Sequence, residues 1–192
     1  MSVQPDATNA VCQYISSLLK MTFSSPLQTY SYSSPLGIIL IAIREETLIG
    51  LWFQDQKYVP NDLPPALTSS QVKERSCTYT QTCHWLDLYF SGKKPDFTPT
   101  LCPDGTSFQK DVWKALLQIP YGETLTYGQL AKSLGTFPRA IGQAVSRNPI
   151  SLIIPCHRVI GANEKLTGYA GGLWRKKALL ELEKGPLNRN PL

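Results

Sequence analysis

Two capping boxes mark helix starts in the second half of this chain, and they constrain its fold more than any other local feature. Thr106 precedes Gln109 and Thr126 precedes Gln129 at the same spacing. At this spacing a hydroxyl and an amide bind the free N–H groups of a helix's first turn. We therefore predict one helix beginning at each pair, the first of which ends before Pro120.

Apolar side chains recur along the first of these predicted helices at helical spacing. They are Phe108, Val112, Leu116 and Leu117. Side chains three or four residues apart lie on one face of a helix. We therefore expect all four to face a hydrophobic core.

The next two predicted helices are joined by a tight turn. The helix from Thr126 should run to about Leu134, because Gly135 is typical of the residue just past a helix. Pro138 suits the first turn of the following helix, which should stop at Asn148. Such a pair is typical of a helix-turn-helix, whose second helix faces DNA. Many such pairs serve only packing, so the pattern alone leaves both interpretations open.

The first hundred residues predict a small antiparallel sheet with helices. The expected strands are 30–32, 36–43 and 47–53, and the expected helices are 9–20 and 69–90. Residues 44–46 are polar and form the expected tip of a hairpin. Residues 93–103 contain three prolines, which is typical of a linker. The sequence therefore predicts an α+β protein of two domains, 1–98 and 99–192.

A cysteine stands where an apolar run breaks. The run 150–154 leads to Pro155, which fixes its own backbone and lacks an N–H, so the run ends there. Cys156 and His157 follow directly. The thiolate is the nucleophilic form of cysteine, and a neighbouring base or cation promotes it. A second Cys-His pair, beginning at Cys83, lies in a predicted helix and is expected to be structural.

Positive charge gathers in the part of the chain that carries Cys156. Residues 139–192 contain nine Lys and Arg residues but only three Asp and Glu residues, which gives this segment a net charge of 9 − 3 = +6. The whole chain has a net charge of +5, so all of the positive excess lies in this segment. This excess suits a polyanion such as DNA. A solvated basic tail is an equal alternative, in which the cations face water. The cations concerned are Arg175, Lys176, Lys177 and Arg189.

The cysteine pattern is that of a protein with reduced thiols. The five cysteines have neither disulfide-framework nor metal-ligand spacing, so we expect no metal site. No apolar stretch reaches the length of a transmembrane helix. Residues 1–10 lack the basic and apolar regions of a signal peptide. We expect a soluble protein of the cytoplasm, or of the nucleus in a eukaryotic host, with no membrane partner.

Spaced motifs within residues 105–185 match a known family. The positions, in family order, are Tyr127, Arg139 to Gly142, Asn148-Pro149, Pro155 to Ile160, Gly168 to Gly172, and Leu179-Leu180 with Glu183. With this set the chain resembles the O6-alkylguanine-DNA alkyltransferases, also called methylated-DNA–protein-cysteine methyltransferases. The resemblance implies a ribonuclease-H-like N-terminal domain and a mostly helical C-terminal domain that holds the whole site.

The resemblance assigns the chemistry to four residues. Cys156 would accept the alkyl group, and His157 would take the thiol proton through a bound water. Glu183 would orient the histidine and stabilise its charged form. Asn148 would brace the turn that carries the nucleophile. Glu181 is two residues earlier on the same expected helix and would therefore point away.

The resemblance also implies which residues reach DNA and hold the base. Arg139 would fill the gap left by an extruded nucleotide, and Tyr127 would crowd the neighbouring phosphate. Further DNA contacts are expected from Ala140, Gly142 and Arg147. The residues expected to line the substrate pocket are Pro155, Val159, Tyr169, Ala170 and Gly171. A simple phosphate contact at a helix N-terminus is the alternative for Arg139.

Three residues depart from the family's usual pattern. Ala170 stands where many relatives have serine, so protonation of the departing base would depend on Tyr169 and backbone N–H groups. Phe137 and Gln143 are bulkier than the residues usually found near this arginine. The DNA-facing helix would then dock more shallowly in the minor groove, or Phe137 would wedge between bases.

The resemblance implies direct, irreversible DNA repair. One alkyl group would move from O6-alkylguanine, and secondarily from O4-methylthymine, in double-stranded DNA to Cys156 after base flipping. The protein would act as a monomer, without a cofactor, and each molecule would react once. The main alternative is a non-catalytic sensor of alkylation damage, although such proteins carry another residue at the nucleophile position. A helix-turn-helix transcription regulator and a thiol hydrolase are further alternatives.

Overall fold

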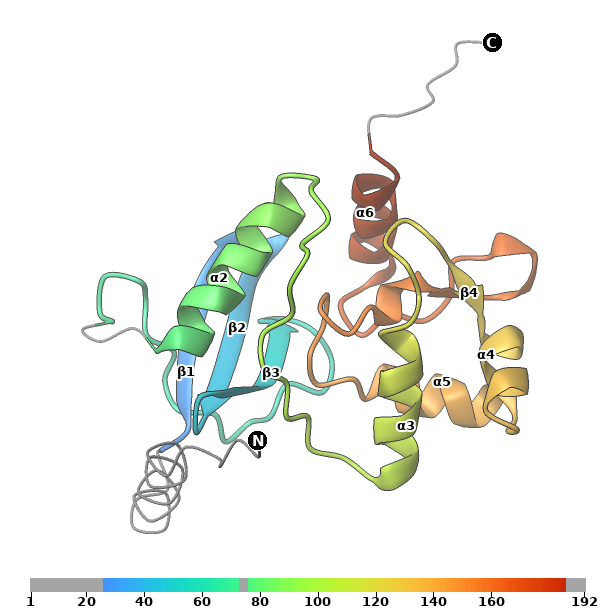
Figure 1. Ribbon diagram of the computed structural model, residues 1–192, viewed down its shortest axis with the longest axis horizontal. Helices are drawn as coiled ribbons and strands as arrows, with labels where there is room; N and C mark the ends of the chain where they lie inside the picture. Colours follow the sequence, from blue (N-terminus) through green and yellow to red (C-terminus); the bar gives the residue numbers. More distant parts are fainter. Residues whose placement is uncertain (1–25, 73–75, 186–192) are drawn as a thin grey trace, which may run out of the picture.

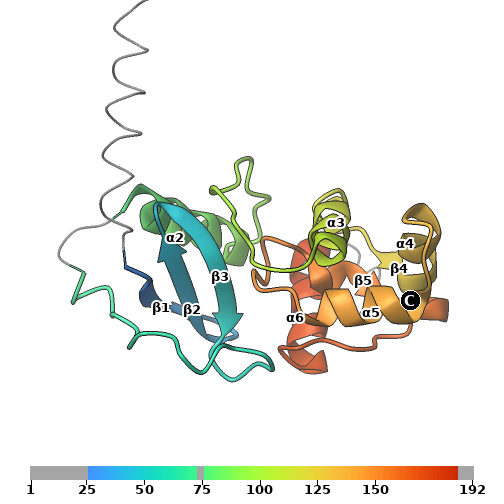
Figure 2. The same ribbon diagram turned by 90° about the horizontal axis from the view of Figure 1, so that it is seen from below.

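The computed structural model describes residues 26–72 and 76–185 of the chain. Two parts lie side by side: a three-stranded sheet covered by one helix, and a group of helices from the second half of the chain (Figure 1). The view from below shows the same two parts (Figure 2). This arrangement confirms the predicted α+β fold class. The helix expected at 9–20 lies outside the described residues.

The sheet consists of three consecutive antiparallel strands. They are β1 (Gln28–Ser34), β2 (Gly37–Arg44) and β3 (Thr47–Phe53), in the spatial order β1-β2-β3. Glu45 and Glu46 both have positive φ, as a two-residue hairpin turn with the twist of its strands requires. The predicted strands and the polar hairpin tip are therefore confirmed.

One helix, α2 (Cys77–Phe90), covers a face of this sheet (Figure 2). The ring of Tyr79 on α2 lies 4.4 Å from that of Tyr30, which pairs with Ile41 across the sheet. Because residues two apart on a strand share a face, the buried isoleucines on either side of Ile41 also face α2.

The predicted start of this helix at residue 69 is wrong. The helix begins after Ser76, whose hydroxyl accepts a hydrogen bond from the amide of Tyr79. Upstream, the Gln71 side chain accepts a bond of 2.9 Å from the amide of Thr68. Such local side-chain bonds compete with helix formation. The predicted end is confirmed, since Ser91 caps the helix.

Three helices follow at the predicted places. They are α3 (Ser107–Leu116), α4 (Tyr127–Ser133) and α5 (Pro138–Ser146). Both capping boxes form with both of their hydrogen bonds. Gly135 has φ 60° just past α4, and Pro138 occupies the first turn of α5. The predicted helix-turn-helix geometry is therefore present in α4 and α5.

The predicted apolar face of α3 is half wrong. Val112 and Leu116 are buried, but Phe108 and Leu117 are about 40% exposed. Trp113 takes their place in the core, where its Nε1 donates a bond of 3.0 Å to the carbonyl of Ala144 on α5. Tertiary packing therefore rotates the buried face of α3 toward the tryptophan.

The edge of β3 that does not pair with β2 forms backbone hydrogen bonds with the second half of the chain. The amide and carbonyl of Leu48 bond to Thr100 and Cys102, so the proline-containing linker runs along this edge. Further along, the amide and carbonyl of Leu51 bond to residues 149–151. These bonds tie the apolar run before Cys156 directly to the sheet.

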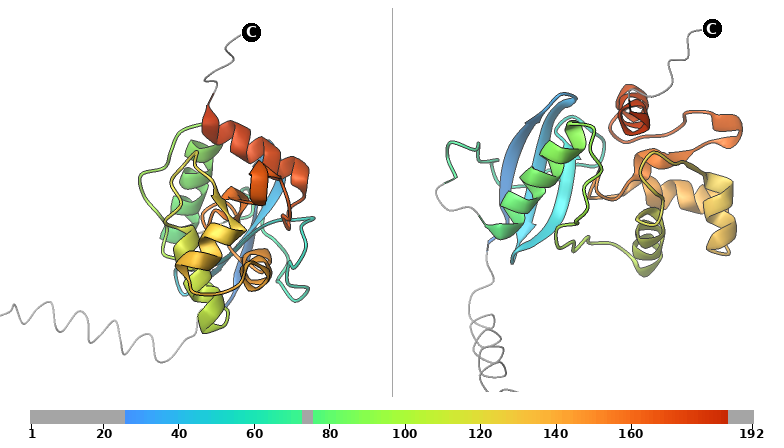
Figure 3. Two further views of the ribbon diagram at one scale, coloured as in Figure 1. Left: turned by 90° about the vertical axis from the view of Figure 1, so that its right-hand side faces the viewer. Right: turned by 45° about the horizontal axis from the view of Figure 1, so that its top comes forward.

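The remaining elements surround Cys156. They are β4 (Leu125–Thr126) paired in parallel with β5 (Val159–Ile160), two 3₁₀ helices (Cys156–Arg158 and Ala162–Glu164), and α6 (Leu173–Lys184). In the left view of Figure 3, helix α6 runs across the top of the molecule, above the α4–α5 pair. None of the helices within the described ranges is long and apolar enough to cross a membrane.

Candidate active site

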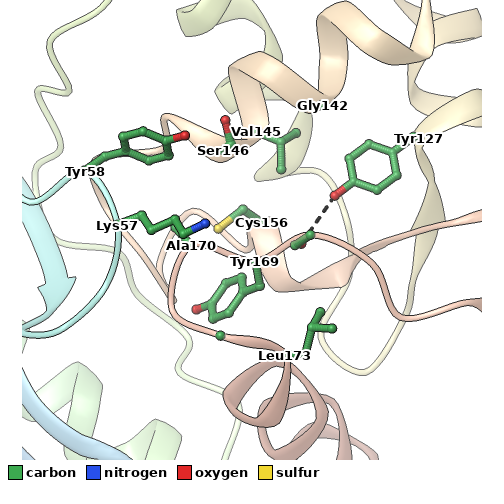
Figure 4. Close-up of a pocket in the computed structure, with 12 residues that line it drawn as sticks. Lys57, Tyr58, Tyr127, Gly142, Val145, Ser146, Cys156, Tyr169, Ala170 and Leu173 are labelled. Atoms are coloured by element: carbon green, nitrogen blue, oxygen red, sulfur yellow. Dashed lines mark hydrogen bonds between the residues drawn. The ribbon is translucent and has the colours of Figure 1, made fainter.

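Cys156 stands at the first position of a 3₁₀ turn, directly after the buried run 150–154. Its amide bonds the carbonyl of Ile154 at 2.8 Å, and the residue is 4% exposed. The residue lines a cavity of about 460 Å³ (Figure 4). The backbone is thus held rigidly while the sulfur opens into a space large enough for a small ligand.

Asn148 holds this turn in place. Its Nδ2 donates to the carbonyl of Ile154 at 2.8 Å and to Sγ of Cys156 at 3.1 Å. Its Oδ1 accepts from the amide of Ile150 at 3.0 Å. These three hydrogen bonds connect Asn148 to both ends of the run 150–154 and to the sulfur of Cys156.

The environment of Cys156 favours the neutral thiol. Burial raises the pKa of this thiol, and the Asn148 hydrogen bond and the Lys176 charge offset that effect only in part. Because the thiolate is the nucleophile, the site needs a base to remove the proton.

His157 and Glu183 form a buried hydrogen-bonded pair. Nε2 of His157 lies 2.6 Å from Oε1 of Glu183, and both side chains are fully buried. Burial alone would raise the pKa of Glu183, but the hydrogen bonds from His157 and Arg158, together with the charge of Arg158, hold it at about 2. Burial lowers the pKa of His157 more strongly than Glu183 raises it.

The ionised state of Glu183 and the neutral state of His157 determine which ring nitrogen of His157 carries the proton. A carboxylate only accepts hydrogen bonds, so Nε2 carries the hydrogen that bonds to Glu183. Nδ1 is buried and has no hydrogen-bond partner among the described residues. A neutral imidazole with a free Nδ1 lone pair can act as a general base, directly or through one water.

The carboxylate of Glu183 also binds three groups that sequence reasoning missed. They are Arg158 (2.8 and 3.0 Å), the hydroxyl of Tyr89 on α2 (2.7 Å) and the amide of Gly122 (3.1 Å). Arg158 belongs to the motif around Cys156, so its position was a signal for this role. Tyr89 carries no local signal, because it comes from the sheet part of the protein. Glu181 is exposed and lies 3.8 Å from Lys177, so it does not reach His157.

Two of the residues predicted to form the pocket line the cavity, and three do not. Tyr169 and Ala170 line it, together with Gly168 and Gly172 of the same loop. Pro155 lines a separate cavity. The carbonyl of Val159 accepts from Lys176, and Gly171 is buried where a side chain would meet the ring of Tyr169.

The alternative in which Arg175 and Lys176 face water is wrong. Nζ of Lys176 is fully buried and donates to the carbonyls of Val159, Thr167 and Gly168 at 2.6, 2.6 and 3.1 Å. Burial lowers the pKa of Lys176 to about 8. Arg175 is buried and pairs with Asp55 at 2.8 Å. These two cations therefore hold the loop 167–172 and the sheet part against α6.

The predicted DNA-facing residues occupy α4 and α5. Tyr127 and Gly142 line the cavity, and the Tyr127 hydroxyl lies 3.5 Å from the carbonyl of Gly168 (Figure 4). Arg139 is exposed in the first turn of α5, after the 79% exposed Phe137, and Ala140 is half-buried. Arg147 lies apart from them at the other end of α5.

Five further residues line the cavity that sequence reasoning did not select. They are Lys57 and Tyr58 after β3, Val145 and Ser146 on α5, and Leu173 on α6. Lys57 and Tyr58 come from the sheet part and reach the cavity only through folding. In the described part of the chain, no three His, Cys, Asp or Glu side chains gather as metal ligands.

The fold and the site define a protein with a buried cysteine, followed by a histidine–glutamate pair, beside a helix-turn-helix. The model of the 6-O-methylguanine DNA methyltransferase DNA-binding domain matches residues 107–185, and that of the ribonuclease-like domain of the same proteins matches residues 28–102. The chain therefore belongs to the O6-methylguanine DNA methyltransferase family.

Individual relatives cover most of the chain. The methylated-DNA–protein-cysteine methyltransferase of Methanosarcina acetivorans is 46% identical over 154 residues, 79% of this chain and 95% of its own. The crystal structure of the Mycobacterium tuberculosis O6-methylguanine methyltransferase superposes with a TM-score of 0.71 and 40% identity, covering 86% of this chain and 97% of that one. The crystal structure of the Mycobacterium tuberculosis OGT protein in complex with DNA superposes with a TM-score of 0.71 and 42% sequence identity. The match covers 82% of this chain and 92% of that one.

Proposed function

We propose that this protein repairs DNA by moving the alkyl group of O6-alkylguanine in a duplex to Cys156. The observation that carries the proposal is a buried cysteine that accepts a hydrogen bond from Asn148 and lines a cavity beside α4 and α5. The next residue in the chain, His157, is paired with Glu183. The names of the relatives and the DNA-binding-domain match support a DNA substrate.

The transfer begins with proton removal from Cys156. Nδ1 of His157 accepts the thiol proton, directly or through one water, and the resulting imidazolium is stabilised by Glu183. The thiolate then attacks the alkyl carbon bound to O6 of guanine. A new S–C bond forms as the C–O bond breaks, and its electron pair stays on the base.

The departing guanine must take up a proton. Burial raises the pKa of Tyr169 well above its ordinary value, so this phenol stays protonated and can donate a hydrogen bond to the base. Ala170 supplies no hydroxyl at this place, which leaves Tyr169 and backbone N–H groups as the donors that we propose. The thioether on Cys156 is a stable product, so each molecule reacts once.

The test is mass spectrometry of the intact protein after mixing with a duplex that contains one O6-methylguanine. We expect a gain of one methyl group per molecule, located on Cys156 by peptide mapping. Tight lesion binding without any mass gain would contradict transfer and support the damage-sensing alternative. Repeated release of free product would contradict the single-turnover part of the proposal.

We propose that Arg139 fills the space left by the extruded base. Arg139→Ala should slow transfer from duplex DNA by at least about tenfold, because unstacking the base costs a few kcal/mol that the side chain offsets. Transfer from the free base O6-methylguanine should change little. Single-turnover rates on both substrates measure this.

The control for Arg139 is Arg44→Ala, which removes an equally charged, exposed side chain from the tip of the sheet. Equal slowing on the duplex and on the free base would remove the proposed role from Arg139. Slowing by Arg44→Ala as well would indicate a general charge effect.

We also propose that the protein acts as a monomer in the cytoplasm, or in the nucleus of a eukaryotic host. The free cysteines at positions 77, 102 and 156 support a reducing compartment. The domain boundary at 98/99 remains a proposal, supported by the exposed polar residues that precede the contact with β3.

A further inference from the structure

The loop that follows β3 holds a tyrosine in an unusual backbone conformation. Tyr58 has a φ of 67°, in the left-handed region that bulky residues rarely adopt. Such a conformation persists where the surrounding structure determines it, and it is common at functional sites. The contacts around Tyr58 show what determines it.

Three contacts fix the loop to the half of the chain that carries Cys156. They are Asp55 to Arg175 at 2.8 Å, the Gln56 side chain to the hydroxyl of Ser151 at 3.1 Å, and the Lys57 amide to the carbonyl of Ala170 at 3.1 Å. The backbone that enters Tyr58 is therefore positioned by the site itself and not by the sheet alone.

The ring of Tyr58 is held from the other side by Arg147. The guanidinium carbon of Arg147 lies 4.0 Å from the ring centroid, which is the geometry of a cation–π contact. Arg147 caps the C-terminal end of α5. The contact with Tyr58 holds the Arg147 guanidinium in place. It therefore accounts for the position of Arg147 without any contact to a DNA phosphate.

Tyr58 lines two neighbouring cavities. One is the 460 Å³ cavity of Cys156, and the other, of about 380 Å³, is lined in part by Trp52, Leu63 and Trp113. In the close-up the sulfur of Cys156 lies between Tyr127 and Tyr58 (Figure 4). Tyr58 therefore closes the side of the cavity that faces away from Tyr127, against the C-terminal end of α5.

Resting on the proposed function, we propose that Tyr58 sets the largest alkyl group that Cys156 accepts. A base held from the Tyr127 side presents its O6 substituent toward the sulfur, and atoms beyond the reacting carbon extend toward Tyr58. A methyl group leaves the ring untouched. A benzyl group meets the ring, and removal of the ring joins the two cavities and gives that group additional space.

The experiment compares two duplexes of one sequence, carrying either O6-methylguanine or O6-benzylguanine. The quantity measured is the ratio of the benzyl to the methyl transfer rate in single turnover. Tyr58→Gly should raise this ratio by about tenfold, the lower end of the discrimination that one small group provides in a binding pocket. Glycine also adopts the positive φ without strain.

The matched control is Tyr58→Phe, which keeps the ring and the contact with Arg147 and should keep the wild-type ratio. Tyr58→Asn is the second ring-deleting variant, because asparagine tolerates positive φ. An unchanged ratio in the ring-deleting variants, or an equal rise in Tyr58→Phe, would overturn the proposal. Absence of methyl transfer in the wild-type protein would instead overturn the proposed function.

Discussion

Cys156→Ser is expected to abolish alkyl transfer, with a fall in the single-turnover rate of at least about 10⁴-fold. A serine hydroxyl is a far weaker nucleophile than a thiolate, and a neutral histidine cannot ionise it fully. The smaller side chain fits the site, because Asn148 can bond to Oγ as it does to Sγ. Binding to a duplex with O6-methylguanine should therefore remain.

Two measurements check this result. The intact mass after reaction should show no methyl gain, and fluorescence anisotropy should show lesion binding within a few-fold of wild type. Cys102→Ser is the control, since Cys102 is an exposed free cysteine away from the cavity, and it should react like wild type. Methyl transfer that persists in Cys156→Ser would move the nucleophile to another residue.

Glu183→Gln is expected to slow the chemical step by about 100-fold, the usual size of a general-base contribution. A neutral amide no longer stabilises the imidazolium of His157, so proton removal from Cys156 becomes harder. Burial raises the thiol pKa, so the variant should regain rate as pH rises and the thiol ionises without help. Single-turnover rates from neutral to alkaline pH measure this difference.

The same substitution should also lower stability. Arg158 is buried and bonds Glu183 at 2.8 and 3.0 Å, so the variant leaves its charge unpaired, at a cost of about 3 kcal/mol. In wild type the lowered pKa of Glu183 contributes stability above its ordinary pKa of 4.5 that is lost as pH falls toward 2. The variant should lack this acid dependence in thermal unfolding, which separates the effect on stability from the effect on rate.

Glu181→Gln is the matched control for Glu183. Glu181 lies on the same helix but is exposed, and its contact with Lys177 at 3.8 Å contributes little. Rate, pH profile and thermal unfolding should all stay at wild-type values. A slower rate in this variant, with a normal rate in Glu183→Gln, would show that the wrong carboxylate was chosen.

Local interactions explain which elements the sequence could predict. The capping boxes, Gly135 and Pro138 act within one or two turns, so the bounds of α4 and α5 follow from the chain alone. The start of α2 does not, because the bond between Thr68 and Gln71 competes with the helix. The face of α3 also does not, because α5 selects Trp113 through the carbonyl of Ala144.

The sequence by itself determined the order of the elements, the family and the motif that carries Cys156, His157 and Glu183. These depend on residue types and short spacings, which the chain displays directly. Only the tertiary structure decided that Tyr89 bonds to Glu183 and that Lys176 is buried. Such contacts join residues far apart in the sequence, and their free energy arises only when folding removes both partners from water.

The residues that line the cavity also fall into those that the sequence could predict and those that only the tertiary structure places there. Tyr169 and Ala170 are in the family motif, so their neighbourhood could be predicted from the sequence. Lys57 and Tyr58 reach the cavity only because β3 pairs with residues 149–151 and brings its following loop to the cavity. Local sequence patterns do not indicate which strand pairs with residues about a hundred positions away. The position of Tyr58 at the cavity therefore could not be predicted from the sequence and follows from the tertiary fold.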